Sequence, residues 1–381
     1  MRILVLGCKD YPAFTTPWVH AGGMEVYTER MIRSLADRAR FTIYAAGGRS
    51  DGAAIVEALG AGRGLRTQPL SLVVKSWARV RRSGRDFDLV NAQTPLAGLV
   101  ARRAKRLFGI PYVVTVHVFG SDPAHAGGRL NAFAYSCIEQ LVFSQAAAII
   151  PTGRRLAAAL EKRYQGIGSR ISVITAACEG VQETAPRADT RARLGITDKN
   201  DVLLFLGRLV DENGIDDLLA AVSFLRHNRP DLRLLIAGTG HRKRDVATRI
   251  RNEGLAEVAR MIGPVRGQEK LDLLAAADVM VRSSWHEVFP EAYLEALSVG
   301  TPVAATPAGD TPFLAEASGA VELLPFGDPR GQAGVLGRLL DDPARRSEMR
   351  ARALDYSRRV RWHDQREAYW SVLERASEGR A

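Results

Sequence analysis

Short apolar runs alternate along this chain with segments whose apolar residues recur every three or four positions. The runs are typical of buried strands, and the recurring pattern is typical of amphipathic helices. Strands that alternate with helices form parallel sheets with helices on both faces. In the first half we therefore predict strands at residues 2–7, 41–46, 89–91, 112–116, 147–151 and 171–174, and helices at residues 25–37, 96–107, 131–143 and 154–164.

The pattern breaks over residues 179–200, which are polar and lack a strong apolar period, and then resumes. This predicts two doubly wound domains, 1–185 and 201–355, joined by a linker at 186–200 and followed by a helical segment at 356–381. Such domains bind ligands at the carboxyl ends of their parallel strands. The second domain has predicted strands at 202–206, 233–237, 258–262, 279–281 and 303–305, and predicted helices at 215–226, 242–253, 269–276, 292–299, 312–316 and 331–340.

Length and composition agree with two domains, because 381 residues with 46% apolar side chains can form two sizeable cores. No run approaches the roughly 20 apolar residues of a membrane span, and residues 1–7 predict a first strand rather than a signal peptide. We therefore expect a cytoplasmic protein. Cys8, Cys137 and Cys178 lie far apart and without metal-ligand spacing, so free buried thiols are expected.

The net charge of +11 lies entirely in the first half, because residues 1–190 hold 25 Lys and Arg against 14 Asp and Glu. In the predicted helical segment 71–82, Lys75, Arg79 and Arg82 share one face of the helix, and Trp77 lies largely on the opposite face. This pattern is compatible with a helix that rests on an anionic membrane surface and equally with an ordinary solvated helix. Nucleic acid is not an expected partner, because no nucleic-acid motif or interleaved aromatic residues accompany the charge.

The stretch 284–296 holds two carboxylates, Glu287 and Glu295, on either side of a predicted loop-to-helix junction. Pro290 suits the first helical position, which leaves the backbone N–H groups around it free for an anion such as a diphosphate. The rise from Pro290 to Glu295 is roughly 7.5 Å. One carboxylate is therefore predicted to accept sugar hydroxyls and the other ribose hydroxyls, with phosphates between them. The backbone groups predicted to face the anion include those of Val288 and Phe289.

Three other loops carry candidate binding residues. Arg208 follows the first strand of the second domain, and a guanidinium at a strand end offers fixed donors to phosphate oxygens. His117 follows a strand of the first domain, at the end where ligands bind. Gly22 and Gly23 precede the first helix, where backbone N–H groups can approach phosphate.

With these motifs, the chain resembles the retaining GT-B glycosyltransferases of family 4 over essentially its whole length. The resemblance implies an α/β fold in which two Rossmann-like, doubly wound domains face a cleft and the C-terminal helix packs back on the first domain. It implies a retaining, metal-independent enzyme that needs no cofactor and moves a sugar from a nucleoside-diphosphate sugar to a hydroxyl acceptor. The first domain would bind the acceptor and the second the donor.

The resemblance also implies roles for individual residues. A histidine at the position of His117 lies under the transferred sugar. The backbone at Val265 meets the base, so the sequence does not distinguish UDP, GDP or ADP. The family usually carries a lysine five residues after the loop arginine of the second domain, and this position is Asn213 here. Asparagine brings no charge, so the leaving diphosphate is stabilised less unless Lys270 or Arg282 supplies the charge.

Two alternative interpretations of the sequence do not fit, and several others remain. Asp86 and Asp88 resemble a metal-binding pair of another glycosyltransferase fold, but they lead into a strand and have no visible partner ligands. No Gly-x-Gly-x-x-Gly follows the first strand, which argues against a dinucleotide oxidoreductase. A nucleotide-sugar epimerase, a glycogen-synthase-like enzyme and a catalytically silent sugar-binding subunit remain alternatives. The basic first half suggests a lipid-linked acceptor in envelope or exopolysaccharide synthesis, with the protein peripheral at the inner membrane face. A soluble acceptor is equally open.

Overall fold

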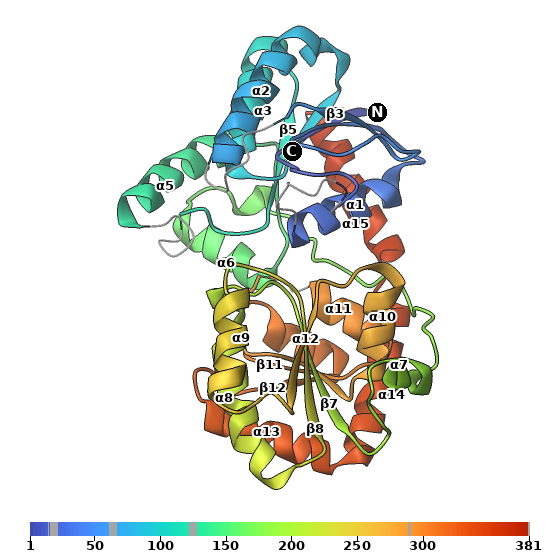
Figure 1. The fold of residues 1–381 in the computed structure, drawn as a ribbon. Helices are drawn as coiled ribbons and strands as arrows, with labels where there is room; N and C mark the ends of the chain where they lie inside the picture. Colours follow the sequence, from blue (N-terminus) through green and yellow to red (C-terminus); the bar gives the residue numbers. More distant parts are fainter. Residues whose placement is uncertain (14, 16–21, 61–66, 122–127, 289–290, 380–381) are drawn as a thin grey trace. The chain divides into compact units, whose positions relative to one another are not determined.

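The computed structural model describes residues 1–13, 15, 22–60, 67–121, 128–288 and 291–379 (Figure 1). The chain divides into two compact units: unit 1 is Met1–Ala176 with Trp362–Ala381, and unit 2 is Ala177–Arg361. The boundaries therefore fall after 176 and 361, where the sequence places them after 185 and 355. The segment 186–200, predicted as a linker, lies within unit 2 and contains the helix α7 (Arg187–Arg193).

All strands of the unit 1 sheet run parallel in the order β3-β2-β1-β4-β5-β6. The edge strand β3 (Ala54–Ala58) was not predicted, because it is short and half exposed. The strand predicted at 171–174 is wrong, since only Ile171 forms a bridge, to Ile149. The other elements are β1 (Arg2–Leu6), α1 (Gly23–Leu35), β2 (Arg40–Ala45), α2 (Thr67–Ser83), β4 (Leu89–Ala92), α3 (Pro95–Phe108), β5 (Tyr112–Val116), α5 (Arg129–Phe143), β6 (Ala148–Pro151), α6 (Arg154–Arg163) and α15 (Trp362–Ser377).

The parallel sheet of unit 2 has the order β12-β11-β10-β7-β8-β9. Counted from the first strand of each unit, both sheets follow the Rossmann order 3-2-1-4-5-6. The charged helix α14 (Pro343–Arg359) and the short edge strand β12 (Val321–Leu323) were not predicted. The other elements are β7 (Asp201–Leu206), α8 (Ile215–Leu225), β8 (Leu232–Ala237), α9 (Lys243–Asn252), β9 (Ala259–Gly263), α10 (Gly267–Ala276), β10 (Val279–Arg282), α11 (Glu291–Ser298), β11 (Val303–Ala305), α12 (Thr311–Ser318) and α13 (Pro329–Asp341).

The C-terminal helix α15 belongs to unit 1, where it packs on α1, β4 and β5 (Figure 1). Its Tyr369 is fully buried. The Tyr369 hydroxyl lies 2.9 Å from Thr115 Oγ1 and accepts a hydrogen bond of 3.2 Å from Asn91 Nδ2. Trp362, the first residue of α15, meets the ring of Tyr27 edge to face at 4.9 Å between centroids. The end of the chain thus completes the core of unit 1, as predicted.

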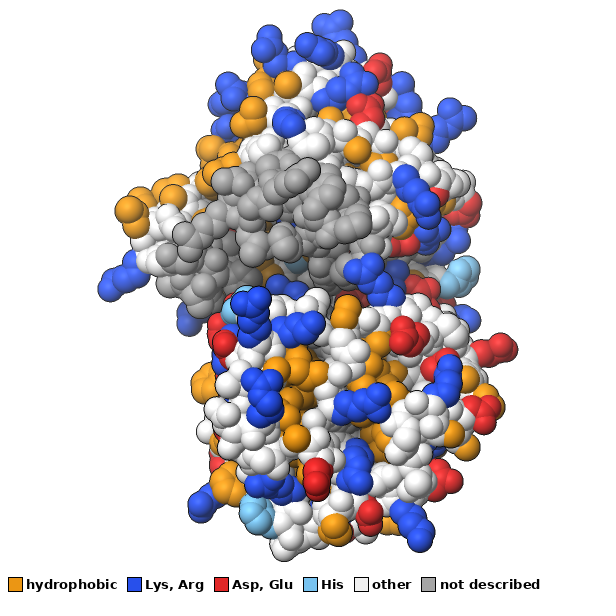
Figure 2. Space-filling view, in the orientation of Figure 1, with side chains coloured by type: hydrophobic (Ala, Val, Ile, Leu, Met, Phe, Trp, Pro, Cys, Tyr) orange, Lys and Arg blue, Asp and Glu red, His pale blue; other side chains and the backbone are white. Residues whose placement is uncertain are grey.

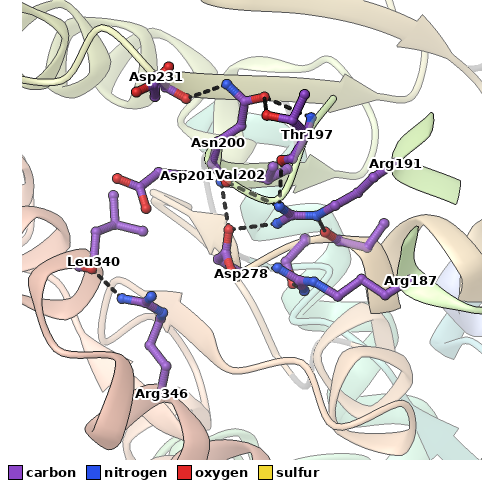
Figure 3. A network of polar contacts seen from close by, with 12 residues as sticks. Arg187, Arg191, Thr197, Asn200, Asp201, Val202, Asp231, Asp278, Leu340 and Arg346 are labelled. Carbon is purple, nitrogen blue, oxygen red and sulfur yellow. Dashed lines mark hydrogen bonds and ion pairs between the residues drawn. The ribbon is translucent and has the colours of Figure 1, made fainter. Parts of the chain in front are cut away.

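A charged network anchors α7 to the amino-terminal edge of the unit 2 sheet (Figure 3). The Asp278 carboxylate accepts hydrogen bonds from Arg187 Nη2 (2.6 Å), Arg191 Nη2 (2.8 Å) and Val202 N (2.8 Å). Arg191 is only 2% exposed, and its remaining donors reach three backbone carbonyls. Burial alone would raise the pKa of Asp278, but the two arginines and the Val202 N–H lower it below its ordinary value. The segment predicted as a linker is therefore held by buried charge.

The cysteines and the helices correct and extend the compositional predictions. Cys8 and Cys178 are buried thiols outside any disulfide, as predicted, whereas Cys137 is exposed because it lies on the outer face of α5. Across the residues described, no helix is both long enough and apolar enough to cross a membrane.

Candidate functional site

The predicted donor residues gather on loops at the carboxyl edge of the unit 2 sheet, because parallel strands present these ends together. The loop after β7 touches the loop after β10 through Gly214, which has φ +64°. A Cβ atom there would lie 1.8 Å from the Ser283 carbonyl oxygen, so only glycine allows this contact. The contact brings two loops that lie far apart in sequence into one site.

Arg208 and Asn213 lie on the loop after β7 and differ in exposure. The Arg208 side chain is exposed, and no hydrogen bond or ion pair joins it to another described residue. Asn213 is buried, and its Nδ2 donates to the Arg208 carbonyl oxygen at 2.7 Å. The Arg208 guanidinium is thus unpaired among the described residues, while the hydrogen bond from Asn213 fixes the backbone of the loop.

Glu287 is held in the loop that precedes α11. Its Oε1 accepts hydrogen bonds from Arg282 Nη2 at 2.5 Å and from Ser284 Oγ at 3.0 Å. Arg282 ends β10 and is 5% exposed. Val288 follows and accepts a hydrogen bond from the Asp310 N–H at 3.0 Å through its carbonyl oxygen. Phe289, predicted to face the anion, lies outside the described residues together with its neighbour at 290.

Glu295 lies on α11 and is also paired. Lys270 Nζ, from α10, donates to Glu295 Oε1 at 2.6 Å, and the Glu295 side chain is 14% exposed. Val265 lies half-buried on the loop between β9 and α10, at the same edge of the sheet. Both predicted carboxylates therefore stand against a cation of a neighbouring element.

In unit 1, His117 follows β5 and joins a buried polar network. Its Nε2 lies 3.0 Å from Gln93 Oε1, and its ring meets Tyr27 edge to face at 5.1 Å. Gln93 Nε2 donates to Asn91 Oδ1 at 3.0 Å, so an oxygen of Gln93 faces the imidazole. Because that oxygen only accepts, His117 carries its proton on Nε2 and leaves Nδ1 as an acceptor. Burial lowers the pKa of His117 to about 3, so the ring is neutral at pH 7.

Gly22 and Gly23 stand at the start of α1, but a carboxylate of the protein occupies this position. Glu25 is 1% exposed, and its Oε2 accepts a hydrogen bond from the Gly22 N–H at 2.7 Å. Its Oε1 accepts one from the Lys9 N–H at 3.4 Å. Burial raises the pKa of Glu25, although Lys9 and these N–H groups act against the shift. Phosphate binding by this loop stays a prediction, and Glu25 already uses one of the donors it would need.

Four residues that hold the candidate sites were not predicted as site residues from the sequence. Arg282 and Lys270 were considered only as substitutes for the missing lysine, and Gln93 and Glu25 were not considered. An arginine that ends an apolar strand, as Arg282 does after Val279 to Val281, is a usable signal because this end faces the ligand edge. In the described part of the chain, no three His, Cys, Asp or Glu side chains gather into a possible metal site.

The chain is similar in sequence and in structure to known proteins. Residues 186–359 match the family described as glycosyl transferases group 1, and residues 22–177 match the glycosyl transferase 4-like domain. The D-inositol 3-phosphate glycosyltransferase of Kineococcus radiotolerans is 30% identical over 100% of this chain and 96% of its own length. The chain belongs to glycosyltransferase family 4.

Solved structures agree with the fold of this family 4 glycosyltransferase. The sucrose-phosphate synthase of Thermosynechococcus elongatus superposes with a TM-score of 0.82 at 19% identity, covering 100% of both chains. The Anabaena protein HepE, solved with UDP and glucose, superposes with a TM-score of 0.79 at 21% identity, covering 98% of this chain and 99% of HepE. At these identities the likeness establishes the GT-B fold.

Proposed function

We propose that this glycosyltransferase moves a sugar from a nucleoside-diphosphate sugar to a hydroxyl acceptor, with retention of anomeric configuration and without a metal ion. The observation that carries the proposal is the charge arrangement at the carboxyl edge of unit 2. There Arg208, unpaired among the described residues, stands on the same sheet edge as two carboxylates, Glu287 and Glu295, each held by its own cation. HepE, which shares the fold, has been solved with UDP-glucose.

Each residue has a part in donor binding under this proposal. Glu287 accepts hydrogen bonds from sugar hydroxyls, Glu295 accepts them from ribose hydroxyls, and the backbone at Val265 meets the base. The diphosphate lies near Arg208 and the amino end of α11, where the helix dipole favours an anion. Glu287 and Glu295 suit this role because cations already orient their carboxylates, so little conformational entropy is lost when the donor binds.

The proposed transfer needs charge stabilisation more than acid or base chemistry. The bond between the sugar C1 and the diphosphate oxygen breaks, and a bond from the acceptor oxygen to C1 forms on the same face. The acceptor proton passes to an oxygen of the leaving phosphate. Arg208 stabilises the negative charge that develops on the diphosphate. In unit 1, the neutral His117 offers Nδ1 as an acceptor for a sugar hydroxyl.

Thermal-shift screening with UDP-, GDP- and ADP-sugars identifies the donor, because a ligand that binds the folded state raises its apparent stability. With that donor, Arg208→Ala and Glu287→Ala should each lower kcat/KM by roughly a hundredfold, the usual cost of one transition-state contact. The exposed Arg244→Ala on α9 is the matched control and should leave kcat/KM unchanged. Wild-type turnover in both site variants would show that the site is placed wrongly. Sugar analysis after incubation with donor alone separates transfer from epimerisation.

For the acceptor, we propose a hydroxyl presented at an anionic membrane surface. The helices α2, α3 and α5 pack side by side in unit 1 and combine exposed cations with exposed apolar side chains. Figure 2 shows basic side chains over α2 and apolar ones over α5. Such a mixture suits the boundary between headgroups and acyl chains. The exposed apolar residues are Leu70, Val74, Leu107, Leu130, Phe133 and Leu141, and exposed cations include Arg81, Arg82 and Arg106.

Two details of α2 differ from the sequence prediction. Lys75 Nζ donates to the carbonyl oxygens of Leu59 and Gly60, and Arg79 pairs with Glu57 at 2.5 Å. These two cations are therefore partly used within the protein. Arg81 and Arg82 remain exposed at the end of the helix.

Flotation with phosphatidylglycerol vesicles and with neutral phosphatidylcholine vesicles tests the membrane proposal. We expect wild-type protein to float with the anionic vesicles at low salt, and Arg81→Glu combined with Phe133→Ser to abolish this. Arg244→Glu in unit 2 is the charge-matched control. Absence of flotation at every salt concentration would contradict the proposal and favour a soluble acceptor. The name of the relatives, D-inositol 3-phosphate glycosyltransferase, would fit such an acceptor.

A further inference from the structure

Arg282 is the most completely engaged cation at the donor edge of unit 2. Its Nε donates to Ser284 Oγ at 3.2 Å, and its Nη1 donates to the Leu206 carbonyl oxygen at 2.9 Å. Its Nη2 donates to both Asn213 Oδ1 at 2.7 Å and Glu287 Oε1 at 2.5 Å. Four of its five N–H donors are therefore used within the described residues, and one on Nη1 is left.

The local backbone is shaped around this guanidinium. A Cβ atom on Gly207 would lie 2.6 Å from Arg282 Nη1, so a side chain at that position would displace the arginine. The guanidinium also lies over the ring of Phe205, at 5.5 Å from its centroid. Strand end, glycine and aromatic ring together hold Arg282 in one orientation.

Asn213 joins the Arg282 guanidinium to the loop after β7. Its Nδ2 donates to the Arg208 carbonyl oxygen at 2.7 Å, and its Oδ1 accepts from Arg282. A lysine at 213 reaches further than asparagine in the same direction, and it would replace the acceptor Asn213 Oδ1 by an ammonium group close to the guanidinium. Two positive charges at that distance in a buried site repel each other strongly. Arg282 and a lysine at 213 are thus incompatible, whereas Arg282 and asparagine are complementary.

We infer that Asn213 and Arg282 together replace the lysine that the family resemblance places at position 213. Arg282 is a positioning residue: it brings the buried positive charge, fixes Glu287 through Oε1 and leaves Oε2 for a sugar hydroxyl. Asn213 links that cation to the backbone of Arg208. Lys270 does not take this part, because it pairs with Glu295 and, among the described residues, has no hydrogen bond to Asn213 or Glu287. The inference rests on the proposed function and names how its donor site is built.

A double-mutant cycle tests whether Asn213 and Arg282 together replace the lysine. It compares wild type, Asn213→Lys, Arg282→Met and the double variant. Each single variant should lose at least tenfold in kcat/KM with the donor found by thermal shift. The double variant should recover to within about threefold of wild type, because the introduced lysine then meets no guanidinium and pairs with Glu287. Losses that multiply in the double variant would overturn the inference.

Two further measurements separate positioning from general damage. Arg282→Lys keeps the charge but has three donors instead of five. It should bind UDP, GDP or ADP alone nearly as wild type does, and lose kcat rather than nucleotide affinity, since Glu287, which is proposed to contact the sugar, is no longer fixed. Equal losses in nucleotide binding and kcat would indicate a merely structural role and overturn the inference.

The melting temperatures of the same four proteins are independent of any activity. Asn213→Lys should lower the melting temperature in the wild-type background and much less in Arg282→Met. If no nucleotide sugar is turned over by wild type but this coupling is found, the proposed function fails and the paired arrangement stands. If the melting temperatures are additive, the pairing itself is contradicted.

Discussion

The two sheets have the same strand order, but the described residues at their carboxyl edges differ in chemistry. In unit 2 the edge is built from charges: Arg208 is unpaired among the described residues, Arg282 holds Glu287, and Lys270 holds Glu295. In unit 1 the described residues at the corresponding edge include a network of neutral groups, in which His117 contacts Gln93 and Gln93 contacts Asn91. One strand order therefore carries a charged edge in unit 2 and, among the described residues of unit 1, a neutral network beside buried carboxylates.

This difference matches what each unit is proposed to bind. A diphosphate needs cations, and held carboxylates suit the hydroxyls of sugar and ribose. A sugar ring and an acceptor hydroxyl need hydrogen-bond partners without charge, which the neutral His117 supplies. The described residues of unit 1 also include buried carboxylates near this edge, Asp10 after β1, Glu25 on α1 and Glu139 on α5. The fold supplies the edge, and the side chains decide its chemistry.

The largest effect is expected where unit 2 relies on buried charge. Asp278→Ala should cost about 3–5 kcal/mol, because it leaves Arg191 buried without its carboxylate. Hydrogen exchange of β7 and β10, followed by mass spectrometry, measures this in unit 2 alone. Asp355→Ala is the control, since its ion pair with Arg359 is exposed and worth about 0–1 kcal/mol. Equal effects of the two variants would contradict the structural importance of the network.

A smaller effect, on the pH dependence of stability, is expected in unit 1. The pKa of His117 is about 3 in the folded state and roughly 6.5 when unfolded. Between these values the unfolded chain binds more protons, so the free energy of unfolding falls as pH drops below about 6.5. His117→Phe should flatten this dependence between pH 6.5 and 4, as read by hydrogen exchange of β5.

The exposed His363→Asn on α15 is the control for this comparison and should keep the wild-type slope. Unit 2 should show its own loss only near and below the ordinary pKa of aspartate, as the lowered pKa of Asp278 is passed. An unchanged slope in His117→Phe would show that the imidazole is not buried neutral.

The smallest effect is expected from one hydroxyl of the neutral network. Tyr369→Phe leaves Asn91 Nδ2 without its acceptor and should cost about 1–2 kcal/mol in urea unfolding. Tyr135→Phe on α5 is the matched control, because its hydroxyl makes no hydrogen bond to another described residue, and it should change stability by less than about 0.5 kcal/mol. If Tyr135→Phe lowered the free energy of unfolding as much as Tyr369→Phe does, the hydrogen bonds of the neutral network would not be what stabilises unit 1.

Much of the fold follows from local pattern. Apolar runs such as Val279 to Val281 predicted strands, and helical periodicity with glycine or proline at the ends predicted most helices. Elements without a local signal were not predicted: the half-exposed strand β3 and the charged helix α14. Both are stabilised mainly by what they pack against, and periodicity does not report that.

The sequence alone determined the alternation of strands and helices, the doubly wound class of both domains and the candidates Arg208, His117, Glu287 and Glu295, because these follow from local pattern and motifs. Only the tertiary structure decided their partners. Arg282 meets Asn213 across 69 positions, and Lys270 meets Glu295 across 25. The physical reason is that charge and hydrogen bonds act over a few ångströms in space, and only the folded sheets bring these distant residues within that range.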